Sequence, residues 1–136
     1  MKTPQALIVE DVSDLSIIFS EALSAAGYEA TCLSDGLKAQ TYLQTNTPDL
    51  LVLDIHLPGI KGDSLLQELQ QDGRFQQTKF IIVTADAQRG EELREEADLV
   101  LLKPVSYRQL RDLSGRLTSV MDHLQTSNIG QKKPEA

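Results

Sequence analysis

The sequence predicts an α/β fold: a five-stranded parallel sheet, doubly wound, with helices on both faces. Short apolar runs alternate with helical patterns five times along the chain. These runs are continuous rather than alternating, which is typical of strands that are buried on both faces. The length of 136 residues suits one domain.

The strands are predicted from apolar runs that are bounded by charged or turn residues. Four runs are clear: Ala6–Val9, Leu50–Leu53, Phe80–Val83 and Leu99–Leu102. A weaker fifth run is Glu29–Leu33. Because these runs are separated by helical segments, the strands are expected to pair in parallel.

The first helix is predicted from the spacing of its apolar residues. Leu15, Ile18 and Ala22 recur at i, i+3 and i+7, so they are expected to share the face toward the core. Ser13 precedes them as the expected N-cap, and Gly27 closes the helix.

The other helices show the same kind of pattern, except the fourth. One-sided apolar residues indicate helices around Ala39 and Leu43, around Leu65, Leu66 and Leu69, and around Leu110, Leu113, Leu117, Val120 and Leu124. The segment 88–97 contains Gly90 and offers only Leu93 as a sizeable apolar anchor. Since helices gain most of their stability from packing an apolar face, this helix should be short and loosely held.

Composition excludes several classes of protein. The net charge is −7, which argues against a nucleic-acid or anionic-membrane binder. No apolar stretch approaches the 18 residues needed to cross a bilayer, and the N-terminal run is too short for a signal peptide. Cys32 is the sole cysteine, so neither an intramolecular disulfide nor a cysteine-based zinc site is possible, and we expect it buried on a strand. The sequence therefore predicts a soluble, cytoplasmic protein.

The domain is expected to span residues 5–124. From residue 125 to residue 136 the chain is polar and contains Gly130 and Pro134, so it is predicted to be a flexible tail.

Chemically active side chains follow four of the predicted strands. They are Glu10 and Asp11 after the first, Asp54 after the third, Thr84 after the fourth and Lys103 after the fifth. In an open parallel sheet, ligands bind outside the carboxyl ends of the strands. Three carboxylates, a hydroxyl and an ammonium group are therefore expected to meet at one edge.

Such a cluster of carboxylates needs a cation. Two carboxylates about 4 Å apart repel by ~4 kcal/mol at an effective dielectric constant of about 20. An all-oxygen ligand set with open positions suits Mg²⁺, which also accepts phosphate oxygens. Lys103 can pair with Asp54 or with phosphate on it, and Thr84 can donate to a phosphoryl oxygen. These are the components for phosphoryl transfer to a carboxylate.

These residues resemble the receiver domain of two-component response regulators. The resemblance rests on the order Glu10-Asp11, Asp54-Ile-His-Leu-Pro58, Gly62, Thr84-Ala85 and Lys103-Pro104, and it covers roughly residues 5 to 124. It implies a flavodoxin-like fold with strand order 2-1-3-4-5 and five helices, the fourth shortened.

The resemblance also implies a role for each site residue. Asp54 would accept a phosphoryl group from a histidine kinase or a histidine phosphotransfer protein. Mg²⁺ would be held by Asp54, by Asp11 directly, by Glu10 through a water molecule and by the main-chain carbonyl of His56. Thr84 would move toward the phosphoryl group and Lys103 would bridge to it. Lys103-Pro104 matches the position of a cis peptide bond in the family.

The sequence departs from the family at two places. Val100 stands where the family usually has a Tyr or Phe that turns inward when the threonine moves, so the usual relay is in doubt. Only 18 residues separate Thr84 from Lys103, fewer than the family usually has, which points to the shortened fourth helix. His56 and Asp86 occupy two positions near the site, and we hypothesise that they pair over it and tune the lifetime of the phosphoryl group.

The expected function is signalling rather than enzymatic turnover. The protein would be a stand-alone receiver, a monomer or weak homodimer that transmits its signal by protein contact. A degenerate receiver that acts as a phosphorylation-independent docking module is the alternative. An FMN-binding module would need a Ser/Thr/Gly-rich loop where Glu10-Asp11-Val12 stands. A haloacid-dehalogenase-type phosphatase would need an acid at position 56, which is His.

Overall fold

The computed structural model describes the backbone of residues 2–130 and the side chains of residues 2–118. Its five strands are β1 (Gln5–Val9), β2 (Glu29–Leu33), β3 (Leu50–Asp54), β4 (Lys79–Thr84) and β5 (Leu99–Leu102). Its helices are α1 (Ser13–Ala25), α2 (Gly36–Leu43), α3 (Gly62–Gln70), α4 (Ala87–Glu92) and α5 (Tyr107–Gly130), with a short 3₁₀ turn, η1 (Gly73–Phe75).

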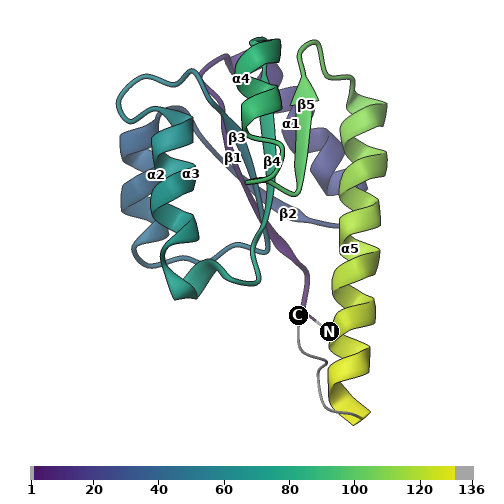
Figure 1. Ribbon diagram of the computed structural model, residues 1–136. Helices are drawn as coiled ribbons and strands as arrows, with labels where there is room; N and C mark the ends of the chain where they lie inside the picture. Colours follow the sequence, from purple (N-terminus) through teal and green to yellow (C-terminus); the bar gives the residue numbers. More distant parts are fainter. Residues whose placement is uncertain (1, 131–136) are drawn as a thin grey trace.

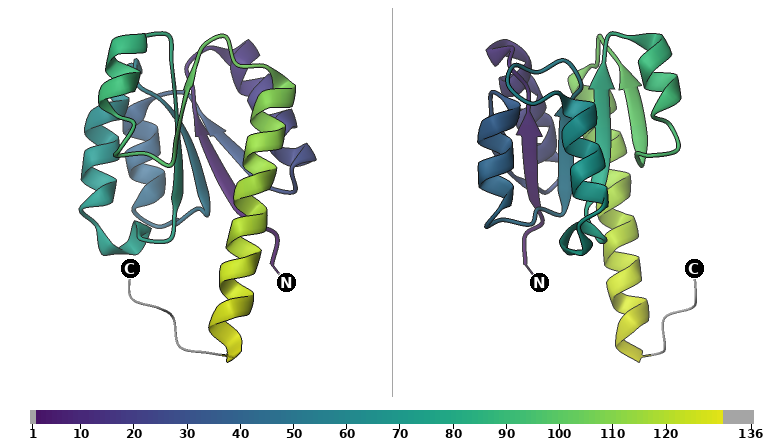
Figure 2. Two further views of the ribbon diagram at one scale, coloured as in Figure 1. Left: turned by 45° about the vertical axis from the view of Figure 1, so that its right-hand side comes forward. Right: turned by 60° about the vertical axis from the view of Figure 1, so that its left-hand side comes forward.

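The strands form one parallel sheet in the order β2-β1-β3-β4-β5, as predicted (Figure 1). Helices α1 and α5 cover one face, and α2, α3 and α4 cover the other (Figure 2). The order places β1 and β3 side by side at the centre, with their crossover connections running to opposite edges. This reversal of direction is where a doubly wound sheet holds its ligand.

Two apolar layers hold the sheet between its helices. Alternate residues of one strand enter different layers: Leu7 and Val9 face α2 and α3, whereas Ala6 and Ile8 face α1 and α5. All five residues of β3 are buried. The continuous apolar runs in the sequence therefore correspond to strands with a core on each face, as predicted.

Strand β2 lies at an edge of the sheet, which explains its weaker apolar pattern. Only β1 pairs with it, and its residues are exposed or half-buried. Cys32 is exposed, so the prediction that it is buried was wrong. The reason is the edge position, because an edge strand has a neighbour on one side only.

Helix α1 differs from the prediction in two details. Its N-cap is Val12, which makes no side-chain hydrogen bond, and Ser13 is the first helical residue instead. Ile18 is 37% exposed, and the face toward the core is formed by Phe19, Ala22 and Leu23. The closing role of Gly27 is consistent with its φ of +103°, a left-handed conformation that favours glycine.

Helix α5 is longer than predicted. It continues to Gly130 and extends beyond the end of the sheet at which β1 begins (Figure 2), whereas the sequence suggested an end at residue 124. The rest of the predicted tail, residues 131–136, lies outside the described residues. No helix within residues 2–130 is both long and apolar enough to cross a membrane.

Helix α4 is short, as predicted. It spans six residues, Ala87–Glu92, and its C-cap Leu93 is 2% exposed and joins the apolar layer on the α2–α3 face. Gly90 is also buried, but it has no side chain to pack. Apolar contacts therefore hold this helix at only a few points.

We expect weak hydrogen-exchange protection over residues 88–96. Few apolar contacts anchor this segment, so it should open locally at lower free energy than the central strands. Native-state hydrogen exchange with residue resolution checks this, with the amides of β4 as the internal reference. Protection equal to that of Ile81 and Ile82, which are fully buried, would contradict it.

Candidate functional site

Four strands deliver the predicted site residues to one edge of the sheet. Glu10 and Asp54 are 3% and 5% exposed, and Thr84 is fully buried, whereas Asp11 lies at the surface. These polar groups are buried because each stands at the end of a strand that has an apolar layer on both faces. At these positions the strands end, but the apolar layers still shield the side chains from solvent.

Gly62 lets helix α3 begin directly against strand β3. Its N–H donates to the carbonyl of Ile55 at 2.8 Å. A Cβ at this position would collide with the main-chain carbonyl of Asp54. The β3–α3 connection therefore packs closely beneath Asp54 and fixes the position of its backbone.

Lys103 joins the two buried carboxylates. Its Nζ lies 3.0 Å from Asp54 Oδ2 and 3.1 Å from Glu10 Oε1. The Lys103 backbone N–H donates to the carbonyl of Thr84 at 2.8 Å, which anchors β5 beside β4 at the site. The Lys103–Pro104 peptide bond is cis, as the resemblance implied.

The carboxylates of Glu10, Asp11 and Asp54 form the cluster that the sequence predicted. One oxygen from each lies within 4.8 Å of the other two. Glu10 Oε1 is paired with Lys103 by charge, yet among the described residues it accepts no well-directed hydrogen bond. Three carboxylates and one ammonium group leave an excess of two negative charges. This excess charge and the all-oxygen ligand set both fit a divalent cation that prefers oxygen ligands.

Burial and charge shift two pKa values in the cluster. Burial of Glu10 and the neighbouring charge of Asp54 raise the pKa of the Glu10 carboxyl, although Lys103 and the Val12 N–H oppose this. Partial burial would lower the pKa of Lys103, but its contacts with Asp54 and Glu10 outweigh it and raise that pKa. Lys103 is therefore a fixed positive charge at neutral pH.

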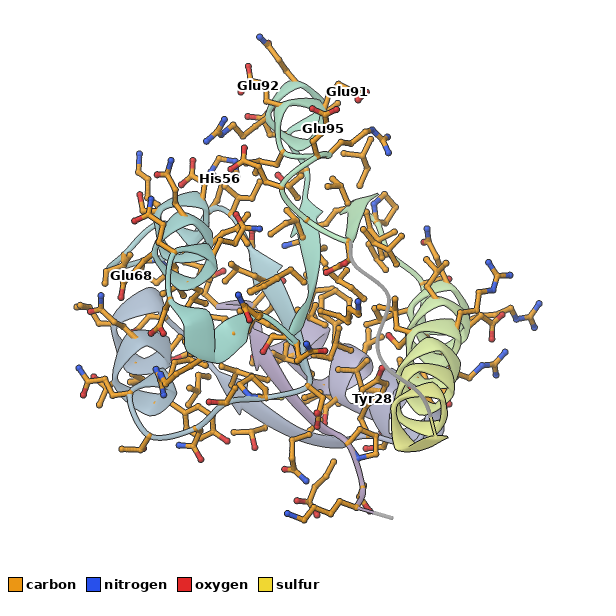
Figure 3. The ribbon with its side chains drawn as sticks, turned by 60° about the horizontal axis from the view of Figure 1, so that its bottom comes forward. Tyr28, His56, Glu68, Glu91, Glu92 and Glu95 are labelled. Atoms are coloured by element: carbon orange, nitrogen blue, oxygen red, sulfur yellow. The ribbon has the colours of Figure 1, made fainter. Side chains whose placement is uncertain are left out.

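Both oxygens of Asp54 have partners. Oδ1 accepts a hydrogen bond from the His56 backbone N–H at 3.0 Å, and Oδ2 faces Lys103. The His56 backbone thus lies beside the Asp54 carboxylate. Its side chain is exposed, with Nε2 3.9 Å from Asp86 Oδ2, so the two side chains that were hypothesised to pair lie near each other. Figure 3 shows His56 at the surface.

The Thr84 hydroxyl is directed toward the β4–α4 connection. Its Oγ1 accepts a hydrogen bond from the Asp86 backbone N–H at 3.0 Å. The Asp86 side chain in turn caps α4 by accepting the Arg89 N–H at 3.0 Å. Thr84 is therefore linked directly to the first turn of α4.

An ion pair that the sequence did not predict links α3 to α4. Arg89 donates to Asp63 Oδ2 from Nε at 3.1 Å and from Nη2 at 2.8 Å. The residues are 26 positions apart, and neither follows a strand directly, so no local pattern relates them. Desolvation would raise the pKa of Asp63, but the hydrogen bonds and charge of Arg89 outweigh it and lower that pKa.

Comparison with known proteins identifies the family to which the chain belongs. The family model described as the response regulator receiver domain matches residues 6–114. The chain belongs to this family. Receiver domains are signalling modules of two-component systems.

Relatives of the receiver domain differ in their overall length. The chain is 34% identical over 110 residues to the phosphate regulon transcriptional regulatory protein PhoB of Rhizobium meliloti, covering 79% of this chain and 48% of PhoB. It is 32% identical over 107 residues to the polar-differentiation response regulator DivK of Brucella ovis, covering 76% of this chain and 87% of DivK. The chain thus spans about half the length of PhoB but matches nearly all of DivK.

Solved receiver domains have the same fold. The signal receiver domain of a LuxO repressor protein from Vibrio parahaemolyticus superimposes with a TM-score of 0.77 at 25% identity, over 91% of this chain and 98% of that one. A CheY-like receiver domain from Methylobacillus flagellatus gives a TM-score of 0.75 at 28% identity, over 85% and 99% of the two chains.

Glu10→Gln should raise the free energy of unfolding at pH 7 in the absence of divalent cations. The pKa of Glu10 is raised in the folded state, so the folded state binds a proton more readily and stability falls as pH rises through that pKa. The neutral amide removes this penalty, while Asp54 still partners Lys103. Urea unfolding at pH 7 and near pH 4 measures the difference.

The gain should shrink toward pH 4, where the carboxyl of Glu10 is itself protonated. Glu21→Gln is the matched control, since Glu21 is exposed and lies on α1, and it should change stability little at either pH. A Glu10→Gln variant that is less stable than the parent at pH 7 would contradict the prediction.

Proposed function

We propose that this receiver domain accepts a phosphoryl group on Asp54 and transmits the signal by contact with another protein. The observation that carries the proposal is the position of the Asp54 carboxylate. It lies between a lysine ammonium group 3.0 Å away and two carboxylates that suit a divalent cation. The donor would be a phosphohistidine on a histidine kinase or a histidine phosphotransfer protein, and the reaction would take place in the cytoplasm.

The transfer forms one bond and breaks one. A carboxylate oxygen of Asp54 attacks phosphorus, the P–N bond of the phosphohistidine breaks, and the imidazole leaves with the electron pair and takes a proton. Lys103 then offsets negative charge on the phosphoryl oxygens, and Thr84 donates a hydrogen bond to one of them.

Glu10, Asp11 and Asp54 are the residues that would hold Mg²⁺, together with the main-chain carbonyl of His56. When bound, Mg²⁺ supplies positive charge to the phosphoryl oxygens and reduces the repulsion between the donor and the acidic site. The residues of the chain fix the position of the acceptor: the His56 N–H holds one Asp54 oxygen and Lys103 the other.

Charged surfaces near the site are candidates for the contact that carries the signal. Residues 86–98 contain six acidic and two basic side chains. Figure 3 shows Glu91 and Glu92 on α4 and Glu95 on the segment that follows it, and all three side chains are exposed. A partner with a basic surface fits this helix, and no nucleic acid or membrane is required. The output would come from a monomer or a weak homodimer.

Incubation with phosphoramidate and Mg²⁺ should add one phosphoryl group to the chain. Intact mass measured within seconds of mixing checks this, and Asp54→Asn should abolish the adduct because the acceptor oxygen is gone. Asp49→Asn, which alters an aspartate outside the site at the other end of β3, is the matched control and should keep it. Absence of the adduct in the parent protein would favour the phosphorylation-independent docking module instead.

His56→Ala should change the rate at which phosphoryl-Asp54 is hydrolysed. The imidazole lies 3.9 Å from Asp86 and belongs to the residue whose N–H contacts Asp54, so its removal would alter the access of water to the acceptor. Loss of the phosphoryl group after removal of the donor, followed by intact mass, measures the rate. An unchanged rate would refute a role for this pair in phosphoryl lifetime.

A further inference from the structure

Thr84 is held on both branches of its side chain by the segment that forms α4. Its hydroxyl oxygen accepts the Asp86 N–H at 3.0 Å. Its methyl group lies against the backbone of Gly90, since a Cβ on Gly90 would be only 3.2 Å from Thr84 Cγ2 and 3.1 Å from Val100 Cγ1. Any rotation of Thr84 must therefore break a hydrogen bond to α4 and alter a contact with it.

The position of α4 depends in turn on Arg89. Apolar packing holds this helix mainly through Leu93. Arg89 adds two hydrogen bonds to one oxygen of Asp63, a residue at the start of α3, and its Nη1 lies 2.8 Å from Glu92 Oε1 within α4. Asp63 and Arg89 are both partly shielded from solvent, at 22% and 37% side-chain exposure.

We propose that the Asp63–Arg89 pair is a clamp that holds α4 against Thr84, so that both are positioning residues for the reaction at Asp54. The proposal rests on the proposed function, because Thr84 serves that reaction by turning from Asp86 toward a phosphoryl group on Asp54. The intact clamp opposes this turn, since it keeps the Asp86 N–H and the Gly90 backbone in place. Releasing the clamp lowers the free energy that the turn requires.

If Arg89 acted only through its charge, its replacement should have the opposite effect on the rate of phosphorylation. Removing a positive charge near the site reduces the attraction of an anionic phosphoryl donor and should slow the reaction. Release of the clamp should make it faster. The sign of the effect therefore separates a positioning role from a simple electrostatic one.

The test compares Arg89→Gln with Arg94→Gln. Arg94 forms an ion pair of 2.7 Å with Glu91 in the same segment, but that pair is exposed, and among the described residues it bridges to no other helix. The maximal rate of phosphorylation at saturating phosphoramidate and Mg²⁺ should rise several-fold in Arg89→Gln and stay at the parent value in Arg94→Gln. The charge-exchanged double variant Asp63→Arg with Arg89→Asp should return the rate toward the parent value.

A second measurement does not depend on phosphorylation. In the protein without donor, hydrogen exchange at the amides of Asp86 and Gly90 should be faster in Arg89→Gln than in the parent, and unchanged in Arg94→Gln. These amides donate to Thr84 Oγ1 and to the Asp86 carbonyl, so they report on the first turn of α4.

The outcomes distinguish the two proposals. If the parent protein takes up no phosphoryl group, the proposed function is refuted. Unchanged hydrogen exchange in Arg89→Gln would then also reject the clamp. If the parent protein is phosphorylated and Arg89→Gln is phosphorylated at the same rate or more slowly, the positioning role is overturned. Faster exchange with an unchanged rate overturns it as well, because the pair would then only stabilise α4.

Discussion

The burial of negative charge at the edge of the sheet is the constraint on which the site depends. Glu10 and Asp54 are almost completely buried, and Asp11 lies beside them. An unpaired buried carboxylate is strongly unfavourable, so a cation must be present in the same place. Lys103 is that cation within the chain, and its Nζ contacts both buried carboxylates. One lysine cannot neutralise three carboxylates, and the remaining charge is what makes the site able to attract a divalent cation.

The sequence was sufficient to predict the sheet and the carboxylate cluster, for a physical reason. Strands buried on both faces leave continuous apolar runs, and the residue after each run must lie at the carboxyl edge. The positions of Asp54, Thr84 and Lys103 follow directly from this rule. Details that depend on three-dimensional neighbours could not be predicted in the same way. Cys32 is exposed because β2 is an edge strand; the weak apolar pattern of this run agrees with that position, but the exposure of a single residue depends on its neighbours in the fold.

The Asp63–Arg89 pair shows the other limit of sequence reasoning. It joins the first turns of two helices that follow neighbouring strands, so its partners meet only after the sheet is assembled. In the sequence, Arg89 belongs to a segment rich in charged residues, where the ordinary expectation is a solvated helix face. Its neighbour Arg94 fulfils that expectation by pairing with exposed Glu91. Only geometry separates the arginine that bridges two helices from the one that does not.

The features that distinguish this chain from its family have one common physical explanation. The connection from Thr84 to Lys103 has only 18 residues, so α4 is short and lies close to the ends of β4 and β5. Gly90 stands at the closest point, where a Cβ would lie 3.1 to 3.5 Å from side-chain atoms of Val100, Thr84 and Leu102, so a larger residue would crowd them. Val100 is half-buried under Gly90. The short connection, Gly90 and Val100 therefore act together: each permits the close approach of α4. That approach brings the backbone of α4 close to the Thr84 side chain.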